Sequence, residues 1–242
     1  MHSGVDIVLV HGAWHGGWCY SRVSTLLRSA GYSVFVPTLS GLGERSHLLS
    51  VSINLETHIQ DVANLIHWER LQRVVLVGHS YGGMIISAVA DRIPRVIDRL
   101  VYLDAFVPGH DQSLHDLIPQ EAAASQVSIA ESRPDKSLPA IPAELFNVNA
   151  ADREWVDALC TPQPIATLTQ RLRLSGNIDR IRRRMYVRAT DNPLGEVFEQ
   201  IDAVLTAHPR WITRKIAAGH DVMIDRPEET AQLILEMADL SG

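Results

Sequence analysis

The sequence contains very little cysteine, with Cys19 and Cys160 as the two cysteines among its 242 residues. Two thiols cannot build the disulfide framework of a small secreted domain, and their spacing does not fit a cysteine metal site. We therefore expect both to be reduced packing residues, as is usual in a cytoplasmic protein.

Long apolar runs are also missing, because no stretch approaches the roughly 18 apolar residues that a membrane-spanning helix needs. The first residues, MHSGVDIVLVHG, lead directly into a predicted strand and lack the basic and apolar regions of a signal peptide. The sequence therefore predicts a soluble, cytoplasmic protein that does not bind a membrane.

Positive charge is in deficit, since 22 Lys and Arg residues face 28 Asp and Glu residues, for a formal net charge of −6. This balance argues against nucleic acid or an anionic membrane as a partner. We interpret the one basic cluster as a solvated helix end before a strand; it contains Arg180, Arg182, Arg183 and Arg184. We expect a small molecule as the partner, and a homodimer is compatible with the sequence.

Short apolar runs alternate with longer segments of helical periodicity, which predicts an α/β fold with a doubly wound, mostly parallel sheet. Strands are expected at Asp6–Val10, Tyr32–Val36, Val74–Val77, Leu100–Leu103, Met185–Arg188 and Trp211–Ile216. Helices are expected at Trp18–Ser29, Leu55–Glu69, Gly82–Arg92, Leu194–Leu205 and Glu228–Ala238. Ligands in such sheets bind beyond the carboxyl ends of the strands.

The stretch from about Val107 to Asn177 interrupts this alternation, because it contains seven prolines and no convincing strand. Within it, Ala151–Leu159 and Ile165–Leu174 have short amphipathic patterns. A long insertion without strands usually has a function, such as covering a site. We therefore expect residues 1–106 and 178–242 to form the core and residues 107–177 to form a helical cap or lid.

The segment Gly78-His79-Ser80-Tyr81-Gly82 fits the pattern Gly-x-Ser-x-Gly between a predicted strand and a predicted helix. In this context the pattern favours a serine nucleophile on a sharp turn, with glycines where side chains would not fit. The turn also places the hydroxyl group at the positive end of the helix dipole. The alternative is a glycine-rich loop whose serine takes no part in chemistry.

A serine hydroxyl needs a base to take its proton, and the base needs an acid to fix its tautomer. His220 follows the last predicted strand, where its loop can reach Ser80, and is the predicted base. Asp191, at the end of the fifth predicted strand, is the predicted acid, which gives the chain order Ser, Asp, His. Asp104, at the end of the fourth strand, is the alternative acid.

Acyl transfer also needs two fixed donors for the developing oxyanion. The backbone N–H of Tyr81, directly after Ser80, is one predicted donor. The second is the N–H of Ala13 in the loop HGAWHGGW at residues 11–18. The glycines of this loop allow a close approach of the backbone to a substrate, although they also suit an ordinary turn.

Five stretches together resemble the α/β-hydrolase superfamily: HGAWHGGWC at 11–19, GLGERSHL at 41–48, GHSYGG at 78–83, LCTPQP at 159–164 and AGHDVMIDRPEE at 218–229. Within it they are similar to the branch of plant methylesterases, the salicylate-binding methylesterase, α-hydroxynitrile lyases and bacterial carboxylesterases. The resemblance covers most of the chain and is weakest from about 107 to 158. It implies the α/β-hydrolase fold. One departure is that Asp191 and His220 are about one residue further apart than in the plant members.

The branch contains two chemistries, and two positions distinguish them. In the lyases a threonine follows the histidine of the oxyanion loop, and a lysine that stabilises departing cyanide follows the catalytic histidine. The corresponding residues here are Gly12 and Asp221. An acidic side chain beside a leaving anion would be unfavourable, so the resemblance implies an esterase. Asp221 itself is expected to point elsewhere.

We therefore expect a serine carboxylesterase that cleaves small apolar or aromatic esters through an acyl-enzyme. No cofactor is expected, and no metal, because the histidines lack carboxylates at liganding spacing. The predicted substrate pocket comprises Gly12, Trp14, Trp18, Trp155, Leu159 and Leu168. The alternative functions are a hydroxynitrile lyase or cofactor-independent oxygenase on the same fold, and a non-catalytic ligand receptor.

Overall fold

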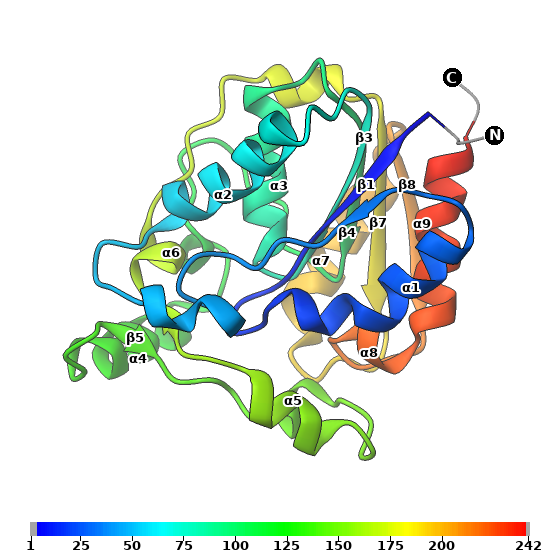
Figure 1. Ribbon diagram of the computed structural model, residues 1–242. Helices are drawn as coiled ribbons and strands as arrows, with labels where there is room; N and C mark the ends of the chain where they lie inside the picture. Colours follow the sequence, from blue (N-terminus) through cyan, green and yellow to red (C-terminus); the bar gives the residue numbers. More distant parts are fainter. Residues whose placement is uncertain (1–3, 241–242) are drawn as a thin grey trace.

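Six parallel strands form the central sheet in the order β2-β1-β3-β4-β7-β8, in a computed structural model that describes residues 4–240 (Figure 1). The strands are β1 (Asp6–Val10), β2 (Val34–Phe35), β3 (Val74–His79), β4 (Ile97–Leu103), β7 (Arg183–Ala189) and β8 (Trp211–Ile216). The predicted α/β fold with a parallel sheet is confirmed. Strand β2 is shorter than predicted, whereas β4 and β7 are longer.

Burial explains the sequence pattern of the central strands. Strand β3, VVLVGH, is buried at every position, and β4 is buried at all but one. Because helices cover both faces of the sheet, these strands are continuously apolar rather than alternating. The edge strand β8 is half-buried or exposed along most of its length.

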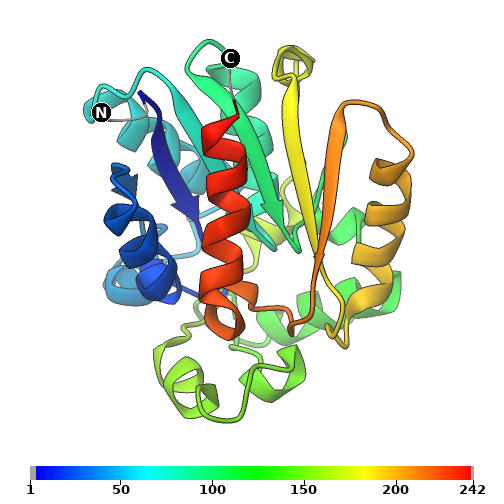
Figure 2. The same ribbon diagram turned by 90° about the vertical axis from the view of Figure 1, so that its right-hand side faces the viewer.

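Helices cover the two faces of the sheet. Helices α1 (Ser21–Ser29) and α9 (Pro227–Asp239) pack together on one face, and α2 (Leu55–Trp68) and α3 (Gly82–Arg92) on the other (Figures 1 and 2). Helix α7 (Gly195–Thr206) packs against β7 and β8, and the short α8 (Val222–Asp225) precedes α9. The described residues also contain 3₁₀ helices at Gly17–Tyr20, Gly43–Leu48, Leu114–Asp116, Ala143–Phe146 and Asn177–Arg180. None of the helices within residues 4–240 has the length and apolar character to cross a bilayer.

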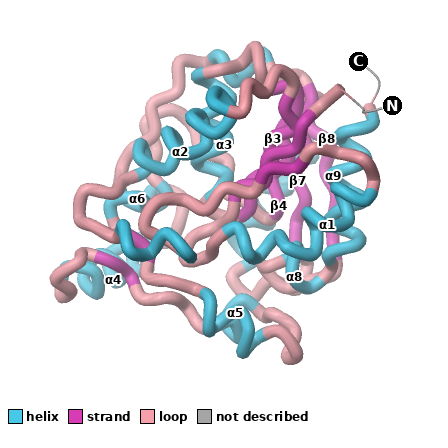
Figure 3. Tube along the Cα trace, viewed as in Figure 1, coloured by secondary structure: helices cyan, strands magenta, loops and turns pink. Residues whose placement is uncertain are grey.

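Residues 104–182, which we call the insert, connect β4 to β7, and the helices α4 and α5 within it lie beside the carboxyl ends of the strands (Figure 2). The insert contains α4 (Gln120–Glu131), α5 (Arg153–Leu159), α6 (Ala166–Thr169) and a two-residue pairing of β5 (Ser137–Leu138) with β6 (Gln163–Pro164). Much of it is loop (Figure 3). Helix α4 was not predicted, because a single one of its residues, Ala130, is buried and its sequence has little amphipathic pattern.

The basic cluster before β7 is only partly solvated. Arg180 and Arg182 are exposed, as expected. Arg184 is buried: its guanidinium donates to the carbonyl of Ile181 and lies 5.7 Å from the centre of the Trp211 ring. The interpretation of the cluster as a solvated end is therefore wrong for Arg184, whose side chain packs between the insert and β8.

Candidate active site

Ser80 lies on the turn between β3 and α3 with a φ of 52°, in the left-handed region that L-residues rarely adopt. A Cβ on Gly78 would lie 2.8 Å from the Gly82 carbonyl oxygen, and a Cβ on Gly82 would lie 2.8 Å from that of Val10. Side chains at these two positions therefore cannot be accommodated. Ser80 is 9% exposed, and its Oγ has no hydrogen-bond partner within residues 4–240.

The next glycine, Gly83, brings α3 against the chain that follows β4. A Cβ there would lie 2.0 Å from the Phe106 carbonyl oxygen. The Phe106 amide in turn donates to the Ser80 carbonyl at 3.1 Å. The turn that carries Ser80 is thus held directly against the loop that carries Asp104.

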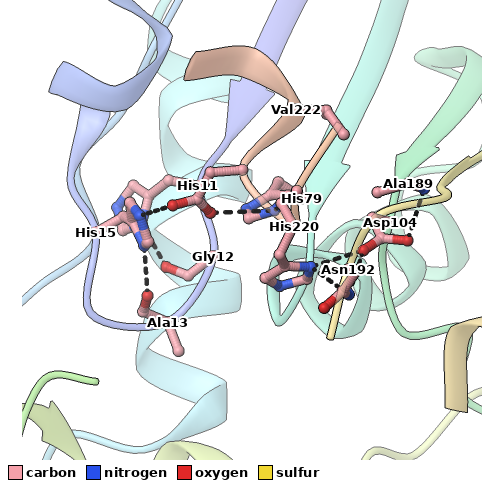
Figure 4. Close-up of polar contacts among 12 residues, drawn as sticks. His11, Gly12, Ala13, His15, His79, Asp104, Ala189, Asn192, His220 and Val222 are labelled. Carbon is pink, nitrogen blue, oxygen red and sulfur yellow. Dashed lines mark hydrogen bonds and ion pairs between the residues drawn. The ribbon is translucent and has the colours of Figure 1, made fainter. Parts of the chain in front are cut away.

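His220 lies in the loop after β8, and its Nδ1 is 2.7 Å from Asp104 Oδ2 (Figure 4). Asp104 is fully buried, follows the end of β4 and has a φ of 42°. Its carboxylate also accepts hydrogen bonds from the Ala189 amide at 3.0 Å and from Asn192 Nδ2 at 2.7 Å. These donors fix the orientation of the carboxylate that faces His220.

The expected pairing of Asp191 with His220 is wrong. Asp191 is exposed, and its Oδ1 accepts a hydrogen bond from Thr190 Oγ1 at 3.0 Å. Its neighbour Asn192 is the residue of this loop that turns inward, with Nδ2 3.2 Å from His220 Nδ1. Asp104, the alternative acid, occupies the position beside the imidazole.

The loop after β1 passes directly beside Ser80. A Cβ on Gly12 would lie 2.8 Å from His79 Nδ1 and 3.0 Å from Ser80 Cβ. The amides of Ala13 and Tyr81 donate no hydrogen bond to any described residue, which leaves both N–H groups available. A threonine, which lyases carry at the position of Gly12, would fit here only if His79 or Ser80 moved.

His11 holds this loop as a neutral imidazole. The Leu39 amide donates to His11 Nε2 at 3.1 Å, so the proton lies on Nδ1, which donates to the Gly12 carbonyl at 2.8 Å. Burial lowers the pKa of His11 to about 3. The Gly12 carbonyl belongs to the same peptide group as the Ala13 N–H.

His15 and Asp221 form a second buried pair, with His15 Nε2 3.1 Å from Asp221 Oδ2. Burial disfavours the charged form of each group. The charge of Asp221 nevertheless raises the pKa of His15 well above its usual value, and the charge of His15 lowers the pKa of Asp221. The Asp221 carboxylate thus contacts His15, away from the acid position beside the His220 imidazole.

Aromatic rings surround His220 from two directions. Phe146 of the insert and Phe198 of α7 have ring centroids 5.4 Å and 5.1 Å from that of His220. The His220 amide donates to the Phe146 carbonyl at 2.9 Å, and a Cβ on Gly219 would lie 2.3 Å from the Asn147 carbonyl oxygen. Neither phenylalanine belongs to a motif; the helical periodicity of α7 was the one signal that pointed Phe198 inward.

The predicted pocket residues differ in their surroundings. Trp18 and Trp155 pack against each other, with ring centroids 5.1 Å apart. Trp14 has a φ of 65°, and its indole N–H donates to the Leu138 carbonyl at 3.2 Å. Leu168 is 1% exposed, whereas Leu159 is 38% exposed. The two tryptophans Trp18 and Trp155 therefore join the core to the insert.

The side chain of Tyr81 packs in the protein interior. It is fully buried, and its hydroxyl lies 3.0 Å from Nδ1 of His58, whose Nε2 donates to the Ser40 carbonyl at 2.9 Å. Burial lowers the pKa of His58 to about 4. In the part of the chain from residue 4 to 240, no group of three or more His, Cys, Asp or Glu side chains could hold a metal ion.

Comparison with known proteins gives a consistent result. The model of the family described as "Alpha/beta hydrolase family" matches residues 7–233. The carbendazim hydrolyzing esterase of Nocardioides sp. (strain SG-4G) is 45% identical over 235 residues, covering 94% of this chain and 97% of that protein. Salicylic acid-binding protein 2 of Nicotiana tabacum is 26% identical over 265 residues, covering 98% of each.

Solved structures show the same fold at low identity. An extracellular alpha/beta-hydrolase from a Paenibacillus species has a TM-score of 0.83 at 24% identity, covering 96% of this chain and 98% of that one. A pyrethroid hydrolase from Sphingobium faniae JZ-2 has a TM-score of 0.77 at 23% identity, covering 98% of each.

We predict that Gly83→Ala destabilises the fold by roughly 3 kcal/mol, because its Cβ overlaps the Phe106 carbonyl and the backbone must shift. Urea denaturation would measure the change. Gly195→Ala is the matched control: a Cβ there meets nothing within 4 Å. Its stability should change by less than about 1 kcal/mol. Equal effects of the two substitutions would contradict the close approach at Gly83.

We also predict that stability falls as the pH drops below about 6.5. Burial lowers the pKa of His11 to about 3 and of His58 to about 4, and it lowers the pKa of His79. The unfolded chain gains a proton at each of these histidines below pH 6.5, whereas the folded chain does not. Each contributes about 1.4 kcal/mol of lost stability per pH unit.

Urea denaturation of His58→Gln between pH 6.5 and 5 tests this prediction. The glutamine amide can still donate to the Ser40 carbonyl but does not titrate. The pH dependence of stability should weaken by about one proton relative to wild type. An unchanged slope would show that His58 is not held neutral.

Proposed function

Because the chain belongs to the alpha/beta hydrolase family, we propose that it hydrolyses carboxylic esters through an acyl-enzyme on Ser80. The observation that carries this proposal is the buried contact of His220 Nδ1 with Asp104 Oδ2, beside a serine held on a strained turn. A serine is activated when a neighbouring histidine accepts its proton and a carboxylate orients that histidine.

The reaction proceeds in two halves. Ser80 Oγ attacks the ester carbonyl while His220 Nε2 takes its proton, and the oxyanion that forms accepts hydrogen bonds from the amides of Ala13 and Tyr81. His220 then returns the proton to the departing alcohol, which leaves an acyl group on Ser80. A water molecule then attacks this ester while His220 takes its proton, and His220 passes that proton to Ser80 Oγ as the acid leaves. Asp104 stabilises the imidazolium that forms in each half.

The surroundings of His220 favour a substrate with an apolar or aromatic part. Phe146 and Phe198 place ring carbon next to the imidazole, so groups bound there would leave water for an apolar surface. We propose that residues 107–177 act as the cap over this site and that Trp14 contributes to its lining. Carbendazim, a methyl carbamate of an aromatic heterocycle, is a suitable trial substrate in view of the related esterase.

Neither of the two residues that distinguish the lyases from the esterases is present in this chain. Gly12 has no room for a threonine, and Asp221 stands where a lysine would be needed. The Asp221 carboxylate is already paired with His15.

We predict that Ser80→Ala lowers the rate of p-nitrophenyl acetate hydrolysis by at least about 10³-fold, because no acyl-enzyme can form. A fluorophosphonate probe should label the wild type and not the variant. Urea denaturation serves to check that the variant is folded. Near wild-type hydrolysis by folded Ser80→Ala would refute the mechanism.

We predict that Asp104→Asn and Asp191→Asn differ sharply in kcat. Asp104→Asn removes the charge that stabilises the imidazolium and should lower kcat by about 10²- to 10⁴-fold. Asp191→Asn alters an exposed side chain and should leave kcat within about threefold of wild type. The reverse order of effects would reassign the acid to Asp191.

A further inference from the structure

The loop that carries Ala13 has three successive carbonyl groups fixed by hydrogen bonds. His11 Nδ1 donates to the Gly12 carbonyl at 2.8 Å, and His15 Nδ1 lies 2.8 Å from the Ala13 carbonyl. The Thr161 amide of the insert donates to the Trp14 carbonyl at 2.8 Å. Because these bonds fix both peptide groups that flank Ala13, they also fix the direction of its unpaired N–H.

Because the pKa of Asp221 is lowered and its carboxyl is ionised, His15 makes both of its contacts as an imidazolium. Nδ1 faces the Ala13 carbonyl, and Nε2 faces the Asp221 carboxylate at 3.1 Å, so both ring nitrogens must carry protons. His15 is 2% exposed and Asp221 is fully buried. The pair is therefore an ion pair shielded from water.

Asp221 connects this ion pair to the loop that carries His220. It directly follows His220, whose carbonyl accepts a hydrogen bond from His79 Nε2 at 2.9 Å. Asp221 Oδ1 is 3.7 Å from the same His79 nitrogen. The ion pair thus links the loop after β1 to the loop after β8, and both of them to the residue before Ser80.

A gain in stability does not by itself account for this pair. Burying two charges costs solvation free energy that their attraction often only balances, and apolar replacements of such pairs are commonly neutral or stabilising. What the pair supplies is a fixed geometry. His15 belongs to the loop after β1 and Asp221 to the loop after β8, so a bond between defined atoms holds the two loops in one relative position. Displacing a reacting or stabilising group by about 1 Å can cost about 10²-fold in rate.

We propose that His15 and Asp221 are positioning residues whose ion pair fixes the Ala13 amide relative to His220. The oxyanion donor and the base then keep the mutual geometry that the transition state needs. This inference rests on the proposed esterase function, in which Ala13 and His220 take those two roles.

The test compares Asp221→Asn, His15→Gln and the double variant with p-nitrophenyl acetate as substrate. Each single variant should lower kcat by about 10²-fold with KM within about threefold, since the lost interaction acts in the transition state. The double variant should lose no more than either single variant, because the two residues act as a unit. Affinity for benzeneboronic acid, which forms a tetrahedral adduct with the serine, should fall in parallel with kcat/KM.

Asp91→Asn is the matched control, since it alters a buried carboxylate at the end of α3 distant from Ser80. Asp91 accepts hydrogen bonds from the amides of Ser175 at 2.6 Å and Ile178 at 2.9 Å. This variant should lose stability and keep kcat and boronate affinity. If Asp221→Asn behaves in the same way, the pair is structural and the inference is overturned.

Two further readouts keep the outcomes distinct. If Asp221→Asn does not fold, His15→Gln carries the test, because glutamine retains a donor but no charge. Asp221→Glu, which keeps the charge, should recover part of the lost kcat, and equal losses for Glu and Asn would also overturn the inference. Failure of the proposed function appears instead in the wild type, as absence of ester hydrolysis or of labelling at Ser80.

Discussion

The contact between His220 and Asp104 joins side chains that are 116 residues apart in the chain, and the order of the sheet makes it feasible. Four neighbouring strands, β3, β4, β7 and β8, each lead into one residue of the site. These residues are Ser80, Asp104, Asn192 and His220, in the same order as the strands. Parallel strands end at one edge of the sheet, so consecutive loops bring their first residues together there.

Several residues around the site have strained backbone. Trp14, Ser80 and Asp104 all have positive φ, and so does Asn147, where the insert meets the His220 loop. Each such residue costs on the order of 1–2 kcal/mol, and the cost is tolerated where surrounding packing fixes the conformation. Around Ser80 that packing is backbone against backbone, with no room for a Cβ on Gly78, Gly82 or Gly83. At Ser80 the strain thus coincides with close approaches of the backbone to itself.

Much of this arrangement could be predicted from the sequence because the signals are local. The apolar run of β3, the glycines around Ser80 and the position of His220 after β8 each lie within a few residues. The acid could not be chosen this way, since Asp104 and Asp191 both follow strands that end at the same edge. Adjacent residues point in different directions, so a shift of one position decides which side chain turns inward. The longer spacing from Asp191 to His220 was the one clue, and the inward residue is the next one, Asn192.

The residues that surround His220 could not be predicted without the folded structure of the insert. Phe146 approaches His220 because the insert closes onto Gly219, a contact between segments about 70 residues apart that no local pattern encodes. The insert also supplies the Thr161 amide, which donates to the Trp14 carbonyl, so a residue distant in the chain helps to fix the loop of Ala13.

The buried pairs His15–Asp221 and His220–Asp104 have the same composition but differ in whether the histidine can exchange a proton. In His15, both ring nitrogens are occupied, one by the Asp221 carboxylate and one by the Ala13 carbonyl, so the ring has no site for proton exchange with a substrate. In His220, Nδ1 faces Asp104 and Asn192, while Nε2 has no partner within residues 4–240. An imidazole can act as a base only through a free nitrogen. The hydrogen bond to the second nitrogen, rather than the carboxylate, therefore separates a fixed cation from a reactive base. It explains why the His220–Asp104 pair, and not the His15–Asp221 pair, can serve the proposed chemistry.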